Sequence, residues 1–243
     1  MPEHALNLAG FNEDTAENIL ENRRRFLKLF PRESGPWALA GCWQIHGSEV
    51  RLVNHLAEAK PAEDARGDTI YCDAIVSNAP DVLAGVKTAD CVPLLIGDPK
   101  TGAFAAVHAG WRGTLAEVAT KALTSMTAEY NTRPQDLLVA IGPAASSCCY
   151  EVGPDVIEPF NSKFPDQELF IKTTADHACI NLAAANRSQL ILAGVDPEKI
   201  NIAPLCTMCR TDLFFSYRRE KSAQGKVGRL MSVIGRANKR GKG

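Results

Sequence analysis

The sequence lacks a net charge of either sign that is large enough to attract a polyelectrolyte. Its 27 Lys and Arg residues nearly balance 28 Asp and Glu residues, so the formal net charge at pH 7 is −1. Affinity for nucleic-acid backbones comes from an excess of positive charge. The balance therefore argues against a nucleic-acid partner.

Long hydrophobic runs are also missing. No apolar stretch approaches the roughly 20 residues that a membrane-spanning helix requires, and residues 1–11 lack the basic and apolar regions of a signal peptide. We therefore expect no membrane partner and a cytoplasmic location. In that setting the 8 cysteines are expected to be reduced thiols, metal ligands or catalytic groups rather than a disulfide framework.

Internal repeats and low-complexity linkers are absent as well. The hydrophobic fraction of 45% over 243 residues is sufficient for the core of one large α/β domain. We predict a single domain over residues 1–243 in which helices cover a mixed β-sheet. The basic, glycine-rich tail at residues 238–243 is predicted to be disordered.

Apolar runs bounded by turn residues predict the strands of this sheet. They lie at residues 81–86, 92–96, 103–107, 137–141, 200–203, 213–217 and 230–234. Helices are predicted from Asp14, from Thr114 to Tyr130 with a Thr114/Glu117 capping box, from Pro154, and over residues 181–194. The arginines at 23–25 are interpreted as a solvated helix face, with an anion contact as the alternative.

Three separate segments place a potential metal ligand beside a glycine or at a strand end, and the ligands are His46, Cys91 and His108. Two imidazoles and a thiolate suit Zn²⁺, and three protein ligands leave a fourth position for water, as in catalytic zinc sites. Spacing alone leaves open a buried thiol for Cys91 and a hydrogen-bonded strand-end histidine for His108. Asp90 is a lesser candidate, as a positioning partner or proton acceptor, because a regular strand would turn it to the opposite face.

Arg112 lies in a glycine-rich turn between His108 and the predicted helix start at Thr114. The free N–H groups of a helix start, together with a guanidinium group, form a site for phosphate or another anion. The alternative is a surface arginine that pairs with a carboxylate.

Several short motifs follow one another along almost the whole chain. They are LNL at 6–8, NR at 22–23, QIHG at 44–47, TADCVPLL at 88–95, HAGWRGT at 108–114, IGP at 141–143, YEVG at 150–153, CT at 206–207, FFSYRR at 214–219 and GR at 228–229. In this order they resemble the family long labelled multicopper polyphenol oxidase or laccase-domain proteins. It is also called the YfiH-type purine nucleoside phosphorylase family, and its bacterial members include the peptidoglycan editing factor.

The resemblance implies an α/β/α sandwich and a metal, usually zinc, held by His46, Cys91 and His108. It also implies phosphorolysis of adenosine, inosine and methylthioadenosine, and deamination of adenosine. The expected partners are therefore small molecules, a purine nucleoside and phosphate. The candidates for holding the phosphate are Arg112, Arg218, Arg219 and Arg229, although the last three could instead form structural pairs.

Three other interpretations stay open at this point. Cys91 could be a nucleophile with His108 as its base, in a cysteine hydrolase or amidase that acts on a peptidoglycan precursor. A copper oxidase with several metal ions would need more than 5 histidines, and His4, His55 and His177 lie outside any ligand-like block. A purely structural zinc site would be closed by a fourth protein ligand, with Cys149, Cys42 and Cys206 as candidates.

The chain departs from the usual family pattern at residues 144–149, which read AASSCC, and Cys209 follows Cys206 at CxxC spacing. A single CxxC is a weak sign of a second metal or a redox pair. Ordinary thiols are the alternative for Cys148, Cys149, Cys206 and Cys209.

Overall fold

The computed structural model describes residues 6–9, 14–30, 36–60, 70–165 and 168–237, and the predicted tail at 238–243 lies outside this part. The helices are α1 (Ala16–Leu27), α2 (Trp111–Leu115), α3 (Val118–Tyr130), α4 (Pro154–Lys163), α5 (Leu182–Leu192) and α6 (Tyr217–Gln224), with short 3-10 turns η1 (Leu56–Glu58), η2 (Pro134–Asp136) and η3 (Pro197–Lys199). The strands are β1 (Ala38–Ala40), β2 (Val50–Val53), β3 (Ala74–Ser77), β4 (Val82–Thr88), β5 (Val92–Gly97), β6 (Phe104–Ala109), β7 (Leu138–Ile141), β8 (Glu151–Val152), β9 (Phe170–Lys172), β10 (Ala178–Ile180), β11 (Ile200–Ile202) and β12 (Leu230–Gly235).

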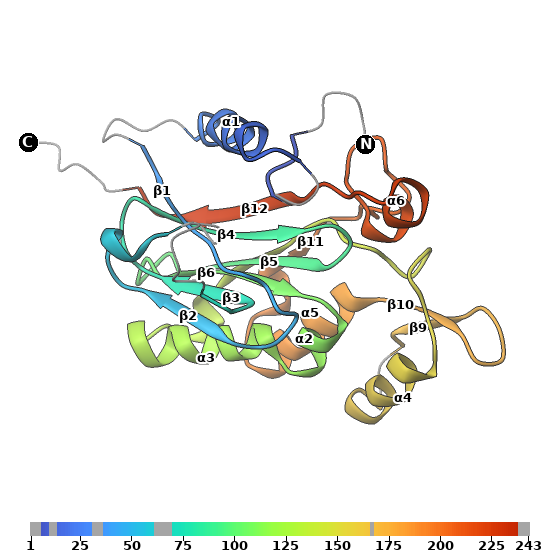
Figure 1. Ribbon diagram of the computed structural model, residues 1–243. Coiled ribbons are helices and arrows are strands. Elements are labelled where there is room, and N and C mark those ends of the chain that lie inside the picture. The colour runs from blue at the N-terminus through green and yellow to red at the C-terminus, as the bar shows by residue number, and fades with distance from the viewer. Residues whose placement is uncertain (1–5, 10–13, 31–35, 61–69, 166–167, 238–243) are drawn as a thin grey trace, which may run out of the picture.

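Two sheets stack on each other in the centre of the molecule (Figure 1). The larger has the strand order β11-β7-β5-β6-β3-β2 and the smaller the order β1-β4-β12, and both mix parallel with antiparallel pairs. Helices α2, α3 and α5 cover the outer face of the larger sheet, and α1 lies beyond the smaller one. The predicted mixed α/β sandwich is confirmed, and its β layer contains these two sheets.

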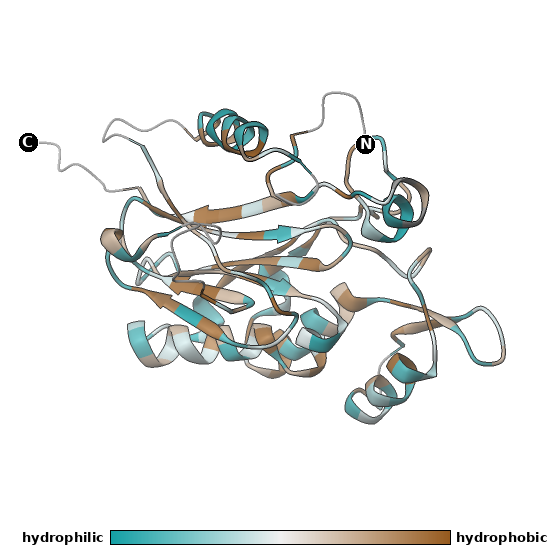
Figure 2. Ribbon diagram, in the orientation of Figure 1, coloured by the Kyte–Doolittle hydropathy of each residue, from teal (hydrophilic) through white to brown (hydrophobic). Residues whose placement is uncertain are grey.

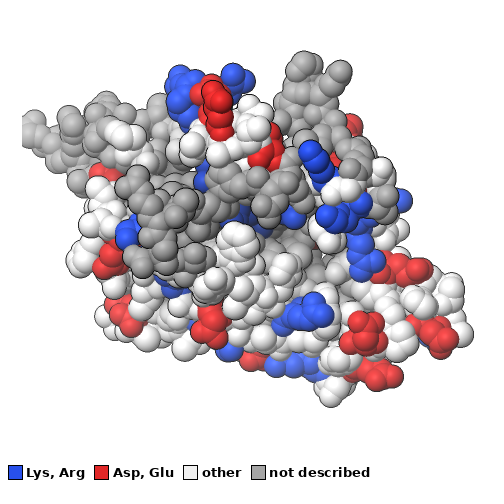
Figure 3. All heavy atoms as spheres, viewed as in Figure 1, with Lys and Arg blue, Asp and Glu red and all other residues white. Residues whose placement is uncertain are grey.

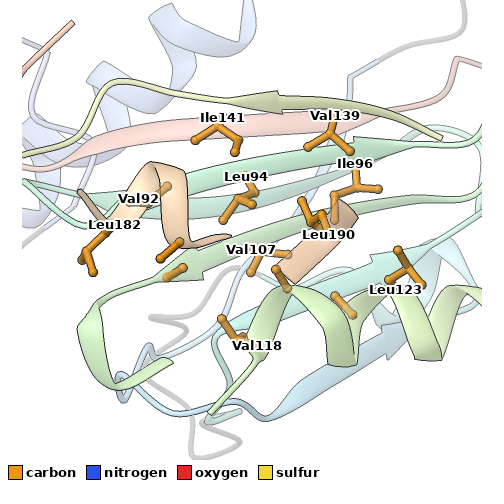
Figure 4. Close-up of a cluster of buried hydrophobic side chains, with 14 of the residues drawn as sticks. Val92, Leu94, Ile96, Val107, Val118, Leu123, Val139, Ile141, Leu182 and Leu190 are labelled. Atoms are coloured by element: carbon orange, nitrogen blue, oxygen red, sulfur yellow. The ribbon is translucent and has the colours of Figure 1, made fainter. Parts of the chain in front are cut away.

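The main core lies between the larger sheet and its helices. Apolar side chains of β5, β6 and β7 meet those of α3 and α5 there (Figure 4). The second core lies between the sheets, where Val82, Ala84 and Val86 of β4 pack on Ile75 and Phe104. The strands are accordingly hydrophobic in Figure 2, while the helices are mixed. Burial of apolar area, at about 25 cal/mol per Å², stabilises both layers.

Most of the predicted elements are present. The strands predicted at 81–86, 92–96, 103–107, 137–141, 200–203 and 230–234 are β4, β5, β6, β7, β11 and β12. Helix α4 begins at Pro154, and α5 is capped by Asn181, whose side chain accepts a hydrogen bond from the Ala184 N–H. In α1 the cap is Thr15 rather than Asp14. The apolar runs and cap residues thus predicted these elements to within a few residues.

The prediction of one capped helix over residues 114–130 is wrong. Helix α2 begins at Trp111, and α3 begins after Glu117, which has a positive φ of 60°. The Thr114 hydroxyl is buried and accepts a hydrogen bond from the Asn186 side chain, so it does not cap a helix. A tertiary contact therefore replaced the local capping box.

The strand predicted at residues 213–217 is also wrong, because this segment is a turn that leads into α6. The Ser216 hydroxyl accepts from the Arg219 N–H and caps that helix. Phe215 is buried against Ala89 and Val227. Phe215 therefore fills a small core below a turn, while Leu213 and Tyr217 are exposed, and none of them lies on one face of a sheet.

Two terminal motifs hold α1 and β12 together. The Asn7 side chain accepts from the Arg229 N–H at 2.9 Å. Arg23 is buried, and its Nε donates to the Leu8 carbonyl, while Asn22 donates to the Asn7 carbonyl. Arg23 therefore does not belong to a solvated helix face, as interpreted from the sequence, and its hydrogen bond stabilises the fold. Within the described residues, no helix is both long and apolar enough to cross a membrane.

Candidate metal and catalytic site

His46, Cys91 and His108 come together at one end of the larger sheet. His46 lies in the loop between β1 and β2, Cys91 directly precedes β5, and His108 is in β6. Their ligand atoms all lie within 4.8 Å of one another, and the two imidazole rings meet edge to face at 4.9 Å. His46 is exposed, Cys91 half-buried and His108 buried, so the cluster is open to solvent on the His46 side.

The backbone around this cluster is specialised for close approach. His46 and Asp90 both have positive φ values, of 58° and 88°, which non-glycine residues adopt only where the surroundings impose them. A Cβ atom on Gly110 would lie 3.1 Å from the His46 ring and 3.2 Å from the Cys91 sulfur. A larger residue at this position would therefore crowd the His46 and Cys91 side chains. Gln44 fixes the loop from the other side through two hydrogen bonds with the Lys87 backbone.

Asp73 is a site residue that sequence reasoning missed. Its buried carboxylate accepts from the N–H groups of Ile45, His46 and Gly47, and its Oδ1 lies 2.8 Å from His108 Nδ1. It therefore fixes both histidine segments and leaves His108 Nε2 to face the cluster. A carboxylate hydrogen-bonded to a ligand histidine is the usual companion of a protein metal site. The sequence signal was a carboxylate directly before the apolar segment of β3.

The electrostatics favour ionised groups. Burial acts to raise the pKa of Cys91, but the charge of His108 and hydrogen bonds from His108 and His46 outweigh it and lower the pKa to about 6. Burial acts to lower the pKa of His108, but the Cys91 thiolate and the Asp73 carboxylate raise it to about 9. Near neutral pH, without a metal, the two groups form a thiolate–imidazolium pair.

The donor set fits a zinc ion. One thiolate and two imidazoles are the ligand types that Zn²⁺ prefers, and three protein ligands are typical of catalytic sites. Among the described residues, no fourth His, Cys, Asp or Glu ligand atom belongs to this group. The candidates for closing it lie elsewhere, because Cys149 and Cys206 belong to a second cluster and Cys42 donates to the Cys72 carbonyl.

Asp90 points away from this cluster into a buried polar network. It accepts from the hydroxyls of Thr207 and Ser216, at 2.7 and 3.0 Å, and from the Arg218 N–H at 2.7 Å. These bonds join the segment before Cys91 to the C-terminal part of the chain. Asp90 is thereby placed to position Cys91 through the backbone.

The four candidate arginines are placed differently. The exposed Arg112 stacks on Trp111 at 4.2 Å, and Arg218 lies over the Tyr150 ring at 4.9 Å and donates to the Glu151 carbonyl. The Arg229 Nη1 donates to two nearby backbone carbonyls, and the Arg219 N–H bonds the cap of α6. In Figure 3, Lys and Arg side chains gather over α6.

The helix start predicted at Thr114 lies at Trp111 instead, and the Thr114 N–H donates to the Gly110 carbonyl within that helical turn, so this N–H is not free for an anion. Arg112 follows two residues after Gly110, which lies against the His46 and Cys91 side chains.

Tyr150 links the cluster with Arg218. Burial and the Cys91 charge raise the pKa of the Tyr150 phenol, while Arg218 acts in the opposite direction. The structure thus brings Arg218 into the electrostatic neighbourhood of Cys91.

A cavity of about 920 Å³ lies at the opposite ends of β5 and β6, lined among others by Asp98, Phe104 and Arg236, and none of the candidate site residues borders it.

The family model described as multi-copper polyphenol oxidoreductase laccase matches residues 1–237. Purine nucleoside phosphorylase YlmD of Geobacillus stearothermophilus is 32% identical over 97% of this chain and 85% of its own length. Adenosine deaminase RL5, from an unknown prokaryotic organism, is 33% identical over 72% of this chain and 68% of its own length. The crystal structure of the Geobacillus YlmD superposes with a TM-score of 0.88 at 30% identity, covering 98% of this chain and 87% of that one. The chain therefore belongs to the multi-copper polyphenol oxidoreductase laccase family.

Proposed function

We propose that this chain is a zinc-dependent enzyme of purine nucleosides that catalyses phosphorolysis of adenosine, inosine and methylthioadenosine and deamination of adenosine. The observation that carries the proposal is the convergence of His46, Cys91 and His108 within 4.8 Å, with Asp73 bonded to His108. Relatives that cover most of the chain are named for these two activities.

In this proposal His46, Cys91 and His108 hold the zinc ion, which supplies Lewis-acid activation of water or of a substrate oxygen. Asp73 keeps the proton of His108 on Nδ1, so that Nε2 stays available as a ligand. Asp90 is a positioning residue for Cys91. The exposed side of the cluster at His46 admits the substrate.

The anionic co-substrate would be bound by arginines. Arg112 and Arg218 are the better candidates, because Arg112 is exposed two residues after Gly110, and Arg218 lies over the ring of Tyr150, whose pKa responds to the Cys91 charge. We propose that Arg219 supports the start of α6 and that Arg229 supports the turn at Val227 and Gly228, whose carbonyls accept from its side chain. Phosphate then replaces the purine at the ribose C1′, which gives a free base and ribose 1-phosphate.

The test incubates adenosine with zinc-loaded protein, with and without phosphate, and separates adenine, inosine, hypoxanthine and ribose 1-phosphate. We expect adenine only when phosphate is present, together with hypoxanthine from phosphorolysis of the inosine that deamination forms, whereas inosine should accumulate without phosphate. Arg218→Ala should raise the KM for phosphate without lowering the rate of inosine formation measured in the absence of phosphate. Absence of both products from the loaded wild-type protein would refute the proposal.

A second candidate function rests on one observation, the chain of contacts from Cys91 through His108 to Asp73. It matches a cysteine nucleophile with a base and an orienting carboxylate, as in amide hydrolases, and a peptidoglycan precursor would be the substrate. Protein stripped of metal distinguishes the two proposals. An amidase would stay active and lose activity on alkylation of Cys91, whereas the zinc enzyme would be inactive until Zn²⁺ is restored.

A further inference from the structure

A second cluster of cysteines lies outside the site described above. Cys148 and Cys149 are in the loop before β8, and Cys206 and Cys209 are in the turn after β11. Their four sulfur atoms all lie within 4.8 Å of one another. The Cys209 sulfur is 3.2 Å from that of Cys149 and 3.5 Å from that of Cys148.

The backbone organises both loops independently of the sulfurs. In the first loop the Ser146 carbonyl accepts from the Cys149 and Tyr150 N–H groups, and in the second the Cys206 carbonyl accepts from the Cys209 and Arg210 N–H groups. The Thr207 N–H donates to the Ala144 carbonyl and joins the two loops. Backbone hydrogen bonds within each loop and between the two loops therefore bring the four thiols together.

The cluster is suited to a cation. Burial acts to raise the pKa of Cys206, but backbone hydrogen bonds from Ser146, Cys209 and Met208 outweigh it and lower that pKa. Burial and the neighbouring sulfurs raise the pKa of Cys148. Hydrogen bonding with the Cys149 sulfur likewise raises the pKa of Cys209. Four thiolates at these distances would repel one another, and a bound cation would remove that conflict.

We propose that Cys148, Cys149, Cys206 and Cys209 form a second metal site that binds Zn²⁺ through four thiolates. A Zn–S bond of about 2.3 Å in a tetrahedron places the sulfurs about 3.8 Å apart. The spacing in the structure needs only small side-chain movements to reach that value. Four protein ligands close the coordination sphere, so this site is structural rather than catalytic.

The position of the cluster explains what such a site would stabilise. Cys149 directly precedes Tyr150, over which Arg218 stacks. Cys206 directly precedes Thr207, whose hydroxyl bonds Asp90 next to Cys91. A zinc ion at this point would tie together two loops that border the catalytic cluster.

The experiment measures zinc stoichiometry. Protein purified without added metal and fully reduced is loaded with Zn²⁺ alone, desalted, and examined by native mass spectrometry and elemental analysis. We expect Cys209→Ser, whose native side chain is exposed, to bind one zinc fewer than the wild type. Cys91→Ser should lose the other zinc only, and the Cys91/Cys209 double variant should bind none.

Cys42→Ser is the matched control, because Cys42 lies outside both clusters and a serine hydroxyl can keep its hydrogen bond to the Cys72 carbonyl. It should bind as much zinc as the wild type. With Co²⁺ in place of zinc, the sulfur-to-metal absorption should persist in Cys91→Ser and disappear from the double variant.

The comparison between each variant and its parent keeps this proposal separate from the catalytic one. If the catalytic cluster binds no zinc, Cys209→Ser must still lower the content by one. Equal zinc content in the wild type and Cys209→Ser overturns the proposal. A Cys149–Cys209 disulfide in unreduced protein, with no zinc uptake by this cluster after reduction, overturns it equally.

Discussion

The Asp73→Asn variant removes a charge and one acceptor from a buried side chain that takes part in four hydrogen bonds. Oδ2 accepts hydrogen bonds from the Ile45 and Gly47 N–H groups, and a backbone N–H group can only donate. Oδ1 accepts from the His46 N–H and also faces the His108 ring, and this ring can change its tautomer. We therefore expect the amide nitrogen to take the Oδ1 position, where it meets only one fixed donor.

The consequence falls on His108. Its Nδ1 would accept from the new amide, and its proton would move to Nε2, the nitrogen that faces Cys91 and His46. A protonated Nε2 cannot bind a metal. We expect zinc affinity to fall by about 10–100-fold. The lost hydrogen bond from the His46 N–H to a charged group would lower the free energy of unfolding by about 1.5–3 kcal/mol.

Zinc affinity is measured by competition with a chelator, and stability by urea unfolding of the metal-free protein. Asp98→Asn is the matched control, because Asp98 is also buried and accepts from Lys100 and Thr101, at the far end of β5. It should lose comparable stability but keep its zinc affinity. Unchanged zinc affinity in Asp73→Asn, or an equal loss in both variants, would refute the reasoning.

Three further predictions concern other parts of the chain. Gly110→Ala should lower activity at least about 10-fold with little change in Tm, because the new methyl group would lie 3.1 Å from the His46 ring; full activity would contradict the close approach. Asp98 stabilises the fold when ionised, because hydrogen bonds from Lys100 and Thr101 outweigh burial and lower its pKa. This contribution is present above the ordinary carboxyl pKa and is lost as pH falls through the lower pKa of the folded state. The difference in the free energy of unfolding between wild type and Asp98→Asn should therefore become smaller when urea titrations are run at acid pH. A difference that does not change with pH would argue against this role of Asp98. Gly228→Ala should lower Tm by several degrees, because its Cβ would meet the Phe215 ring at 2.5 Å; an unchanged melting curve would mean that the ring has room to move.

Local patterns in the sequence were sufficient for most of the elements. The apolar runs of β4, β5 and β6 are buried on both faces, so they stand out without any knowledge of their partners. Pro154 and Asn181 mark helix starts through their own chemistry. The same reasoning failed at Thr114 and at residues 213–217, because a buried side-chain contact there outweighed the local preference.

The ligand types at His46, Cys91 and His108 were also readable from the sequence, since few side chains bind zinc and each stood beside a glycine or a strand end. Their convergence was decided by tertiary contacts. The pairing of β5 with β6 brings Cys91 next to His108, and Asp73, directly before β3, holds the His46 loop through backbone hydrogen bonds. For the same reason, the sequence did not predict the role of Asp73 or the convergence of the four cysteines in one cluster. A hydrogen bond or a set of sulfur atoms within 4.8 Å depends on how separate loops pack, and no residue carries that information alone.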